Sequence, residues 1–328
     1  MKSRSVASAP AKVILFGEHF VVYDKPAIVI AIDKRAYVTV KPRSDDKIVI
    51  KSATIGASGA FSISGEYWPI EGERKNEAKF KPIYSIAKNL LCLSDEKTGL
   101  NIEINSSIPI AAGLGSSAAV AVASAAAIGS LLEINLAKKD IFNLALEAEK
   151  IVHRNPSGVD PAISTYGGAL LYRKSEGIIR LNIESGLPLI VGNTGIERVT
   201  GDMVSHVSRL RNRYPSIVDR IMEAGSAIAY LGVEALKSGD LKTLGDLMNM
   251  NHALLCALGV SNHAIEQLIA AARSSGALGA KLTGAGGGGC IIALSEPNSI
   301  HRIVEAIKHA GGGAFATSKA SEGVRIEE

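Results

Sequence analysis

A glycine-rich loop in the first half of the chain has the composition of a phosphate-binding loop. Residues 109–119 read PIAAGLGSSAA, follow a β-prone run and lead into an alanine-rich stretch that predicts a helix. Glycines let backbone N–H groups turn toward an anion, and a helix start offers unpaired donors and a positive dipole end. The hydroxyls of Ser116 and Ser117 are able to cap this helix or to ligate Mg²⁺. The loop is therefore a candidate phosphate cradle.

Residue types alone leave three interpretations of this loop open. The first is a structural turn in which a serine caps the helix. The second is a dinucleotide site, because Gly113, Gly115 and Ala118 match G-x-G-x-x-G/A, and an acid, Glu133, follows 20 residues after the first glycine. That acid should end a β-strand, yet Glu133 lies at the expected end of a helix. The third is a nucleoside triphosphate loop, although the Walker A pattern is absent.

A second segment holds acids suited to phosphoryl transfer. Residues 147–160 read EAEKIVHRNPSGVD. Transfer to an alcohol needs an oriented hydroxyl, Mg²⁺ and positive groups near the developing charge. A carboxylate can accept the hydroxyl proton, and a lysine beside it keeps it ionised. By residue type, Glu149 fits a solvated helix face better, and Asp160 fits a turn acid as well as a base.

Two further motifs flank these segments. Residues 9–23 read APAKVILFGEHFVVY, and residues 281–290 read KLTGAGGGGC. Taken alone, Lys12 is an ordinary strand lysine, and Glu18 with His19 forms a structural pair. The four consecutive glycines of the second motif are costly to order. They predict a loop that a ligand or another backbone approaches closely.

Together these motifs resemble the three signatures of the GHMP kinases, a family named for galacto-, homoserine, mevalonate and phosphomevalonate kinases. The first motif, with VVY and PA after GEH, is similar to the form found in the mevalonate branch. NPSGVD resembles the family segment that carries a catalytic aspartate, which homoserine kinases generally lack. The resemblance spans Pro10 to Cys290.

The resemblance implies a role for each matching residue. Asp160 is the catalytic base with Lys12 beside it, and Ser117 and Glu149 are the Mg²⁺ ligands. The segment NTGIERVT supplies Thr200 on the substrate side, with Glu197 where the family commonly has proline. The substrate-binding residues are Glu18, His19, Thr200, Gly284 and Ala285. The ATP-binding residues are Pro109, Ile110, Ala111, Ala112, Gly113, Leu114, Gly115, Ser116, Ser117, Ala118 and Ala119.

The implied activity is ATP- and Mg²⁺-dependent phosphorylation of the 5-hydroxyl of (R)-mevalonate, a step toward isoprenoids. The expected partners are ATP and mevalonate, with a homodimer as the family's precedent. Two alternatives stay open. One is another kinase of the family, acting on phosphomevalonate or a sugar. The other is a non-catalytic sensor on the same fold, which would require damage to the base or metal residues; the sequence has none.

Composition agrees with a small-molecule enzyme. The 328 residues are 47% hydrophobic and 21% charged, which is typical of a globular protein of about two domains. A net charge of +4 is weak evidence for nucleic-acid binding and suits an anionic substrate. Three cysteines form neither a disulfide scaffold nor a zinc motif, so we expect a reduced, cytoplasmic setting.

One long uncharged run has the length of a membrane-spanning segment. Residues 104–132 lack charge and are long enough to cross a bilayer. They contain Pro109, Gly113 and Gly115, and their helical part is mostly alanine and serine. A loop followed by a buried helix explains this run better than a membrane span.

The order of elements predicts an α+β fold. The resemblance makes it the two-domain GHMP fold, with a ribosomal S5 domain 2-like N-terminal domain and a ferredoxin-like C-terminal domain. A composition shift at 174–187 divides the chain into a nucleotide-binding domain, 1–180, and a C-terminal domain, 181–328. We expect strands at 5–16, 27–42, 47–53, 99–110, 167–174, 178–184 and 290–294. We expect helices at 81–94, 116–132, 201–238, 241–256, 262–275 and 299–310, and one more that carries Glu149 and ends before Pro156.

Overall fold

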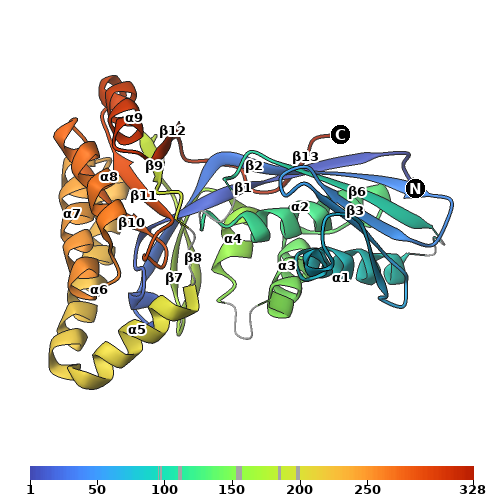
Figure 1. The fold of residues 1–328 in the computed structure, drawn as a ribbon, viewed down its shortest axis with the longest axis horizontal. Coiled ribbons are helices and arrows are strands. Elements are labelled where there is room, and N and C mark those ends of the chain that lie inside the picture. Colours follow the sequence, from blue (N-terminus) through green and yellow to red (C-terminus); the bar gives the residue numbers. More distant parts are fainter. Residues whose placement is uncertain (95, 97, 110–112, 153–156, 184–185, 197–199) are drawn as a thin grey trace.

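The computed structural model describes residues 1–94, 96, 98–109, 113–152, 157–183, 186–196 and 200–328. Within these residues the chain forms two sheets, each with helices packed against it (Figure 1). The first follows the order β13-β1-β2-β6-β3-β4-β5, with β7 added to β2 and β8 to β7. The second follows β10-β11-β9-β12. This mixed arrangement confirms the α+β prediction.

The first sheet is built from nine strands within the described residues. They are β1 (Ser5–Phe16), β2 (Ala27–Arg43), β3 (Ile48–Ser52), β4 (Ala57–Phe61), β5 (Tyr67–Glu71), β6 (Gly99–Ser106), β7 (Ala169–Arg173), β8 (Gly177–Leu181) and β13 (Arg325–Ile326). The second sheet contains β9 (Leu189–Asn193), β10 (Gly279–Thr283), β11 (Cys290–Leu294) and β12 (Gly313–Thr317).

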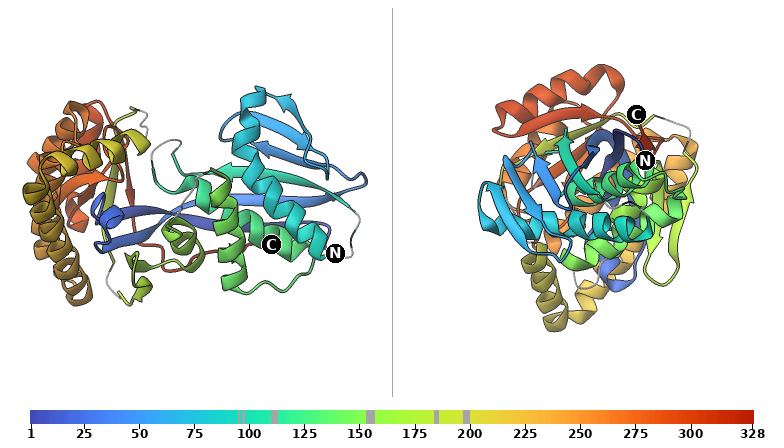
Figure 2. Two further views of the ribbon diagram at one scale, coloured as in Figure 1. Left: turned by 90° about the horizontal axis from the view of Figure 1, so that it is seen from below. Right: turned by 90° about the vertical axis from the view of Figure 1, so that its right-hand side faces the viewer.

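Strands β1 and β2 form the long central strand pair of the molecule. They pair antiparallel from Ser5 opposite Val40 to Phe16 opposite Ile28. Their far ends extend from the first sheet toward the helices of the second (Figures 1 and 2). β1 is almost continuously buried, and β2 is buried from Ala27 to Ile32, as their apolar runs require, before it alternates with exposed positions. Lys12 therefore lies on a long rigid element near the middle of the protein.

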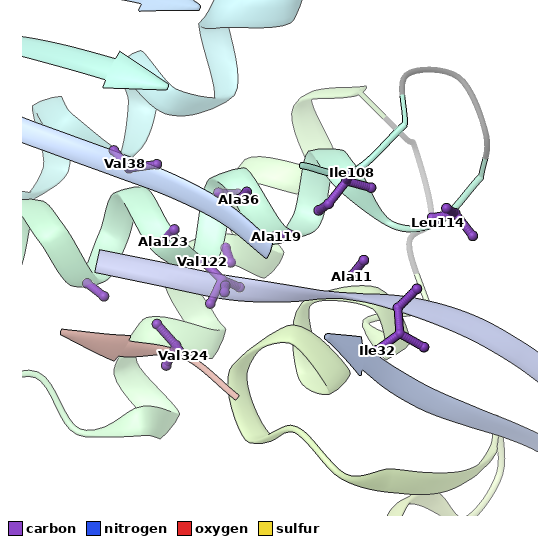
Figure 3. Close-up of a cluster of buried hydrophobic side chains, with 14 of the residues drawn as sticks. Ala11, Ile32, Ala36, Val38, Ile108, Leu114, Ala119, Val122, Ala123 and Val324 are labelled. Atoms are coloured by element: carbon purple, nitrogen blue, oxygen red, sulfur yellow. The ribbon is translucent and has the colours of Figure 1, made fainter. Parts of the chain in front are cut away.

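Helices α1 (Glu77–Leu93), α2 (Ser116–Leu131) and α3 (Lys138–Val152) cover one face of the first sheet (Figure 1). The alanines of α2 explain its uncharged sequence, because small side chains let the helix lie directly on β1 and β2. Figure 3 shows Ala119, Val122 and Ala123 in this cluster with Ala36 and Val38. None of the helices in the described part of the chain is long and apolar enough to cross a membrane.

Helices α7 (Leu241–Ala257), α8 (His263–Ser274) and α9 (Ile300–His309) pack against the second sheet, and α5 (Thr200–Arg213) and α6 (Pro215–Ser238) pack beside them (Figure 1). The prediction of one helix over 201–238 is wrong, because the helix is interrupted at Tyr214. Pro215 has no N–H to continue α5 and instead occupies the first turn of α6, where that donor has no partner to lose.

Several elements escaped the sequence analysis. The hairpin of β4 and β5 is rich in small and polar residues, and β12 and β13 pair only with distant strands. The short helix α4 (Val159–Tyr166) was also not predicted. Its Pro161 looks like a helix breaker in the sequence, but it lies in the first turn of a helix that begins directly after Gly158. Division of the chain near residue 180 stays a prediction, since β13 returns to the first sheet.

A buried ion pair joins the two halves. The Lys281 ammonium on β10 donates to the carboxylate of Glu18, which follows β1, and both side chains are 0% exposed. Lys281 Nζ also donates to Leu282 O at 2.7 Å, and Asn251 Nδ2 donates to Glu18 Oε2 at 3.4 Å. Burial raises the pKa of Glu18 and lowers that of Lys281, so each charge depends on the other.

We predict that Lys281→Met lowers the free energy of unfolding by about 3–5 kcal/mol, because it leaves the Glu18 carboxylate buried without its cation. The loss should be larger at pH 8 than at pH 5, where Glu18 can take up a proton. Urea unfolding at both pH values measures it. The double variant Glu18→Gln/Lys281→Met should recover most of the loss. Equal effects from Lys281→Met and from Lys308→Met, which removes an exposed helix pair with Glu305, would contradict the prediction.

Candidate active site

The glycine loop ends where α2 begins. Gly115 is the N-cap residue, with a left-handed backbone (φ 74°) and no side-chain capping bond. The interpretation of this loop as a serine-capped turn is therefore wrong. The first N–H groups of a helix have no intrahelical partners, so this end of α2 is an anion site of the expected kind. Of the predicted ATP-binding residues, Ile110, Ala111 and Ala112 lie outside the described residues.

Lys12 passes directly beneath this loop. Its backbone N–H donates to Leu114 O at 2.9 Å. A Cβ on Gly115 would lie 2.8 Å from Lys12 Cγ, so a glycine is needed at that position both for space and for its positive φ. The loop and the lysine thus fit together as one unit, although Lys12 and Leu114 are 102 positions apart in the sequence.

The ammonium of Lys12 reaches the acid on α4. Lys12 Nζ lies 3.1 Å from Asp160 Oδ1, and the two side chains are 7% and 33% exposed. Asp160 is in the first turn of α4, where the helix dipole favours a negative charge. The structure therefore brings together the two residues predicted to be catalytic, and it leaves Asp160 accessible from solvent.

Glu149 on α3 lies within the electrostatic reach of this pair. Burial raises its pKa to about 7, the charge of Asp160 adds to the rise, and Lys12 opposes it. Glu149 Oε2 is buried and has no hydrogen-bond partner among the described residues. A buried carboxylate oxygen without a partner is unfavourable. Its position next to a second carboxylate is chemically suited to a cation.

A cavity of about 380 Å³ opens beside the start of α2. Ser116 and Ser117 line it together with apolar side chains, among them Phe80 and Ile83 on α1 and Ile55 in the turn between β3 and β4. A largely apolar cavity with hydroxyls at one end is typical of a small-molecule site. Sequence reasoning missed the apolar residues of this cavity, because they lie on separate elements and carry no motif.

The second glycine motif packs against the protein's own backbone. Gly287 N donates to Val260 O at 2.8 Å, and a Cβ on Gly286 would lie 2.1 Å from the same oxygen. Thr283 Oγ1 donates to Ile14 O at 2.9 Å and accepts from Ile14 N at 3.1 Å. The glycines therefore bring the loop after β10 close to the turn before α8, and the threonine ties that loop to β1.

His19 connects the first motif to this loop. Its Nε2 donates to Ala285 O at 2.8 Å, and its backbone has φ 61°, a strained value for a residue other than glycine. Its neighbour Glu18 is enclosed and faces Lys281 rather than a cavity. The structure therefore joins His19 to the loop at Ala285, whereas Glu18 is enclosed with Lys281; contact of these residues with an acceptor stays a prediction. Thr200 begins α5, and its side chain lies outside the described residues.

The dinucleotide interpretation fails at Glu133. This residue follows the end of α2 rather than a strand, has φ 58°, and pairs with the ammonium of Met1. It therefore lies at the opposite end of α2 from the loop and cannot hold a ribose bound there.

Another cluster has the side chains of a metal site. His252 Nε2 lies 3.0 Å from Glu266 Oε1, and Cys256 Sγ lies 3.3 Å from the same oxygen. Leu282 N–H points at His252 Nδ1 from 3.5 Å, which makes Nδ1 the acceptor and places the ring proton on Nε2. Burial raises the pKa of the Cys256 thiol to about 11. In this arrangement both groups donate to Glu266, so the three side chains form a hydrogen-bond network.

Comparison with known proteins supports the resemblance. The sequence profile of the GHMP kinases N terminal domain matches residues 81–168, and that of the GHMP kinases C terminal matches residues 233–313. The mevalonate kinase of Pyrococcus abyssi is 41% identical over 331 residues, with 98% of each chain covered. That of Pyrococcus horikoshii is 42% identical with the same coverage.

Solved structures agree. The crystal structure of L. major mevalonate kinase in complex with R-mevalonate matches with a TM-score of 0.81 at 27% identity, covering 97% of this chain and 96% of the other. The Methanococcus jannaschii mevalonate kinase matches with a TM-score of 0.83 at 28% identity, covering 97% and 99%.

We predict that Glu149→Gln stabilises the metal-free protein at pH 8 and has little effect at about pH 4.5. A carboxyl whose pKa is raised from 4.5 in the unfolded chain to about 7 in the folded state opposes folding increasingly as pH rises from the first value to the second. The shift corresponds to at most about 3–4 kcal/mol at alkaline pH. Thermal unfolding of both proteins in EDTA at the two pH values measures it. A gain that is the same at both would show that Glu149 ionises normally.

Proposed function

We propose that this chain, which belongs to the GHMP kinase family, transfers the γ-phosphoryl group of ATP to the 5-hydroxyl of (R)-mevalonate. The observation that carries the proposal is the contact between Lys12 and Asp160 at the start of α2, beneath the glycine loop. The identity of the alcohol follows from relatives about 40% identical over nearly the whole chain, which are mevalonate kinases.

The ATP site consists of the glycine loop and the cavity beside it. Backbone N–H groups at the start of α2 and the helix dipole bind the phosphates. The nucleobase fits the apolar part of the cavity, near Phe80 and Ile83, while Ser116 and Ser117 line its α2 end. Loop residues 109–119 thereby direct the terminal phosphate toward Lys12 and Asp160.

The chain also has groups that fit a magnesium ion. Glu149 Oε2 is buried without a hydrogen-bond partner among the described residues, and carboxylate and hydroxyl oxygens are the ligands Mg²⁺ prefers. We assign Glu149 and Ser117 as the residues that would hold it. When bound with ATP, Mg²⁺ neutralises charge on the β- and γ-phosphates.

Asp160 accepts the proton of the attacking hydroxyl. The hydroxyl oxygen forms a bond to the γ-phosphorus, the bond from that phosphorus to the β–γ bridging oxygen breaks, and the products are 5-phosphomevalonate and ADP. Lys12 lies 3.1 Å from the Asp160 carboxylate and neutralises charge on the transferred group. Because the two residues are already in contact, positioning contributes as much here as base strength.

The acceptor site lies toward the second glycine motif. His19, Thr200, Gly284 and Ala285 are the residues proposed to contact mevalonate, with Glu18 holding His19 in place. We also propose a cytoplasmic homodimer with an N-terminal domain to about residue 180 and a C-terminal domain beyond it. The exposed free thiols of Cys92 and Cys256 suit a reducing compartment.

We predict that Asp160→Asn lowers kcat about 10²- to 10⁴-fold while ATP binding stays close to that of the wild type. A coupled ADP-release assay with mevalonate measures turnover, and a fluorescent ATP analogue measures binding. Asp246→Asn, on an exposed position of α7, is the matched control. A panel with phosphomevalonate, galactose and homoserine tests the acceptor. Near-normal turnover by Asp160→Asn would refute the base assignment, and faster turnover of another alcohol would refute the substrate.

We further predict that Ser117→Ala/Glu149→Gln raises the Mg²⁺ concentration needed for half-maximal rate by at least tenfold, because both protein ligands are lost. Titration of MgCl₂ at fixed ATP measures the change, and Ser124→Ala, on the same helix but enclosed, is the control. A superimposable Mg²⁺ titration would remove both residues from the metal site.

A further inference from the structure

The chain after β12 returns to the first sheet as a strap, residues 318–324. It leaves the second sheet and runs back to β13 beside β1 (Figures 1 and 2). Ser318 O accepts from Asp33 N at 3.1 Å, and Ala320 N donates to Ala31 O at 2.8 Å. Ala320 O accepts from Gly168 N at 2.8 Å. The strap is therefore hydrogen-bonded between β2 and the turn that follows α4.

The strap then crosses the end of α4 in direct backbone contact. Val324 N donates to Thr165 O at 3.1 Å. A Cβ on Gly323 would lie 2.1 Å from Thr165 O, and a Cβ on Gly167 would lie 2.4 Å from the carbonyl carbon of Glu322. No side chain separates the two backbones here. This end of α4 cannot approach the strap without a clash or retreat without losing its hydrogen bond.

Arg35, on β2, holds the strap through hydrogen bonds to its carbonyl groups. Its Nη2 donates to Gly323 O at 2.6 Å, and its Nη1 donates to Glu322 O at 3.3 Å. The same guanidinium bonds Ser8 on β1, with Nε to Ser8 Oγ at 2.7 Å and Nη2 to Ser8 O at 3.1 Å. Arg35 is only 6% exposed, so these bonds form where water does not compete. The strap is thereby tied to the strand that carries Lys12.

Hydrophobic packing also holds the strap in this position. Val324 is 7% exposed and belongs to the core cluster that includes Ala11 and Val122. Figure 3 shows its side chain beside α2 and β1. Ser164, two residues before the end of α4, donates through Oγ to Pro10 O at 2.9 Å, which fastens the helix to β1. The C-terminal part of α4 is thus held by both β1 and the strap.

This arrangement bears on the catalytic acid, because α4 has only eight residues. Asp160 and Thr165 lie about 7.5 Å apart along the helix axis. Because Ser164 and Thr165 both lie near the C-terminal end of this short helix, a displacement there shifts the whole helix and with it Asp160, whose contact with Lys12 is 3.1 Å long. We propose that the strap is a positioning element: through Gly323 and Arg35 it holds α4 so that Asp160 meets Lys12. The catalytic consequence rests on the proposed function; the geometric one does not.

The test is Gly323→Ala in the full chain, since the added methyl group must displace the strap from Thr165 O. We expect kcat to fall on the order of tenfold to a hundredfold, as misplacement of a catalytic group by about 1 Å does. The KM values for ATP and mevalonate should stay within about twofold, because neither binding loop touches the strap in the described contacts. Gly313→Ala is the matched control, because its Cβ would meet Asn193 at an ordinary 3.9 Å.

Arg35→Lys provides a second variant that keeps the positive charge and loses the two-pronged hydrogen bond to Gly323 and Glu322. It should lower kcat less than Gly323→Ala does, again at constant KM. Unchanged kcat in both variants, with the folded state verified by thermal unfolding, would overturn the proposal. A rise in KM for ATP that accounts for the whole loss of efficiency would overturn it as well.

A readout without turnover separates this proposal from the proposed function. Acetic anhydride labelling of Lys12, followed by peptide mass spectrometry, reports whether its amine is engaged by Asp160. Gly323→Ala should label Lys12 faster, toward the rate of Asp160→Asn, while Gly313→Ala keeps the wild-type rate. This outcome would support the strap even if the wild type phosphorylated none of the tested alcohols. A wild-type labelling rate in Gly323→Ala would refute the strap even if the wild type phosphorylated mevalonate.

Discussion

The contact between Lys12 and Asp160 is the constraint on which the rest of the structure depends. The lysine lies on a strand near the N-terminus, and the acid lies on a short helix more than 140 residues later. A single ion pair of this kind contributes little to stability when one partner is open to solvent. The scaffold must therefore impose the contact. The long β1–β2 pair, the alanine-rich α2 and the returning chain end all hold one of its two partners.

Two acids show how the protein divides stability from function. Glu18 is enclosed with a lysine and an asparagine, and it joins the two halves of the molecule. Glu149 is half-buried near another carboxylate, its Oε2 is enclosed without a partner among the described contacts, and its pKa is raised to about 7. In the first arrangement the carboxylate charge is compensated by a lysine, whereas in the second the carboxylate oxygen is left available to bind a cation. Unfavourable electrostatics of the second kind are typical of functional sites.

Sequence reasoning succeeded where the chemistry is local. The glycine loop, the strand before it and the helix after it are consecutive, so their pattern predicts the start of α2 directly. The pairing of Lys12 with Asp160 came from the family resemblance, because no local pattern relates residues on different elements. The enclosure of Glu18 could not be foreseen for a similar reason: its partner Lys281 is 263 residues away, and its burial depends on how the two halves meet. The strands β12 and β13 were missed because their partners are equally distant.

The glycines illustrate the same division between local and tertiary causes. Gly115 was expected to admit a phosphate, yet the atom that most restricts it is Cγ of Lys12, which belongs to the protein. Gly286 is restricted by the carbonyl of Val260, and Gly323 by that of Thr165. In each case the absent side chain lets two distant segments touch, so a motif that resembles a ligand loop also records a tertiary contact. A glycine outside any motif, such as Gly323, can therefore matter as much to the active site as those within one, and only the folded chain reveals it.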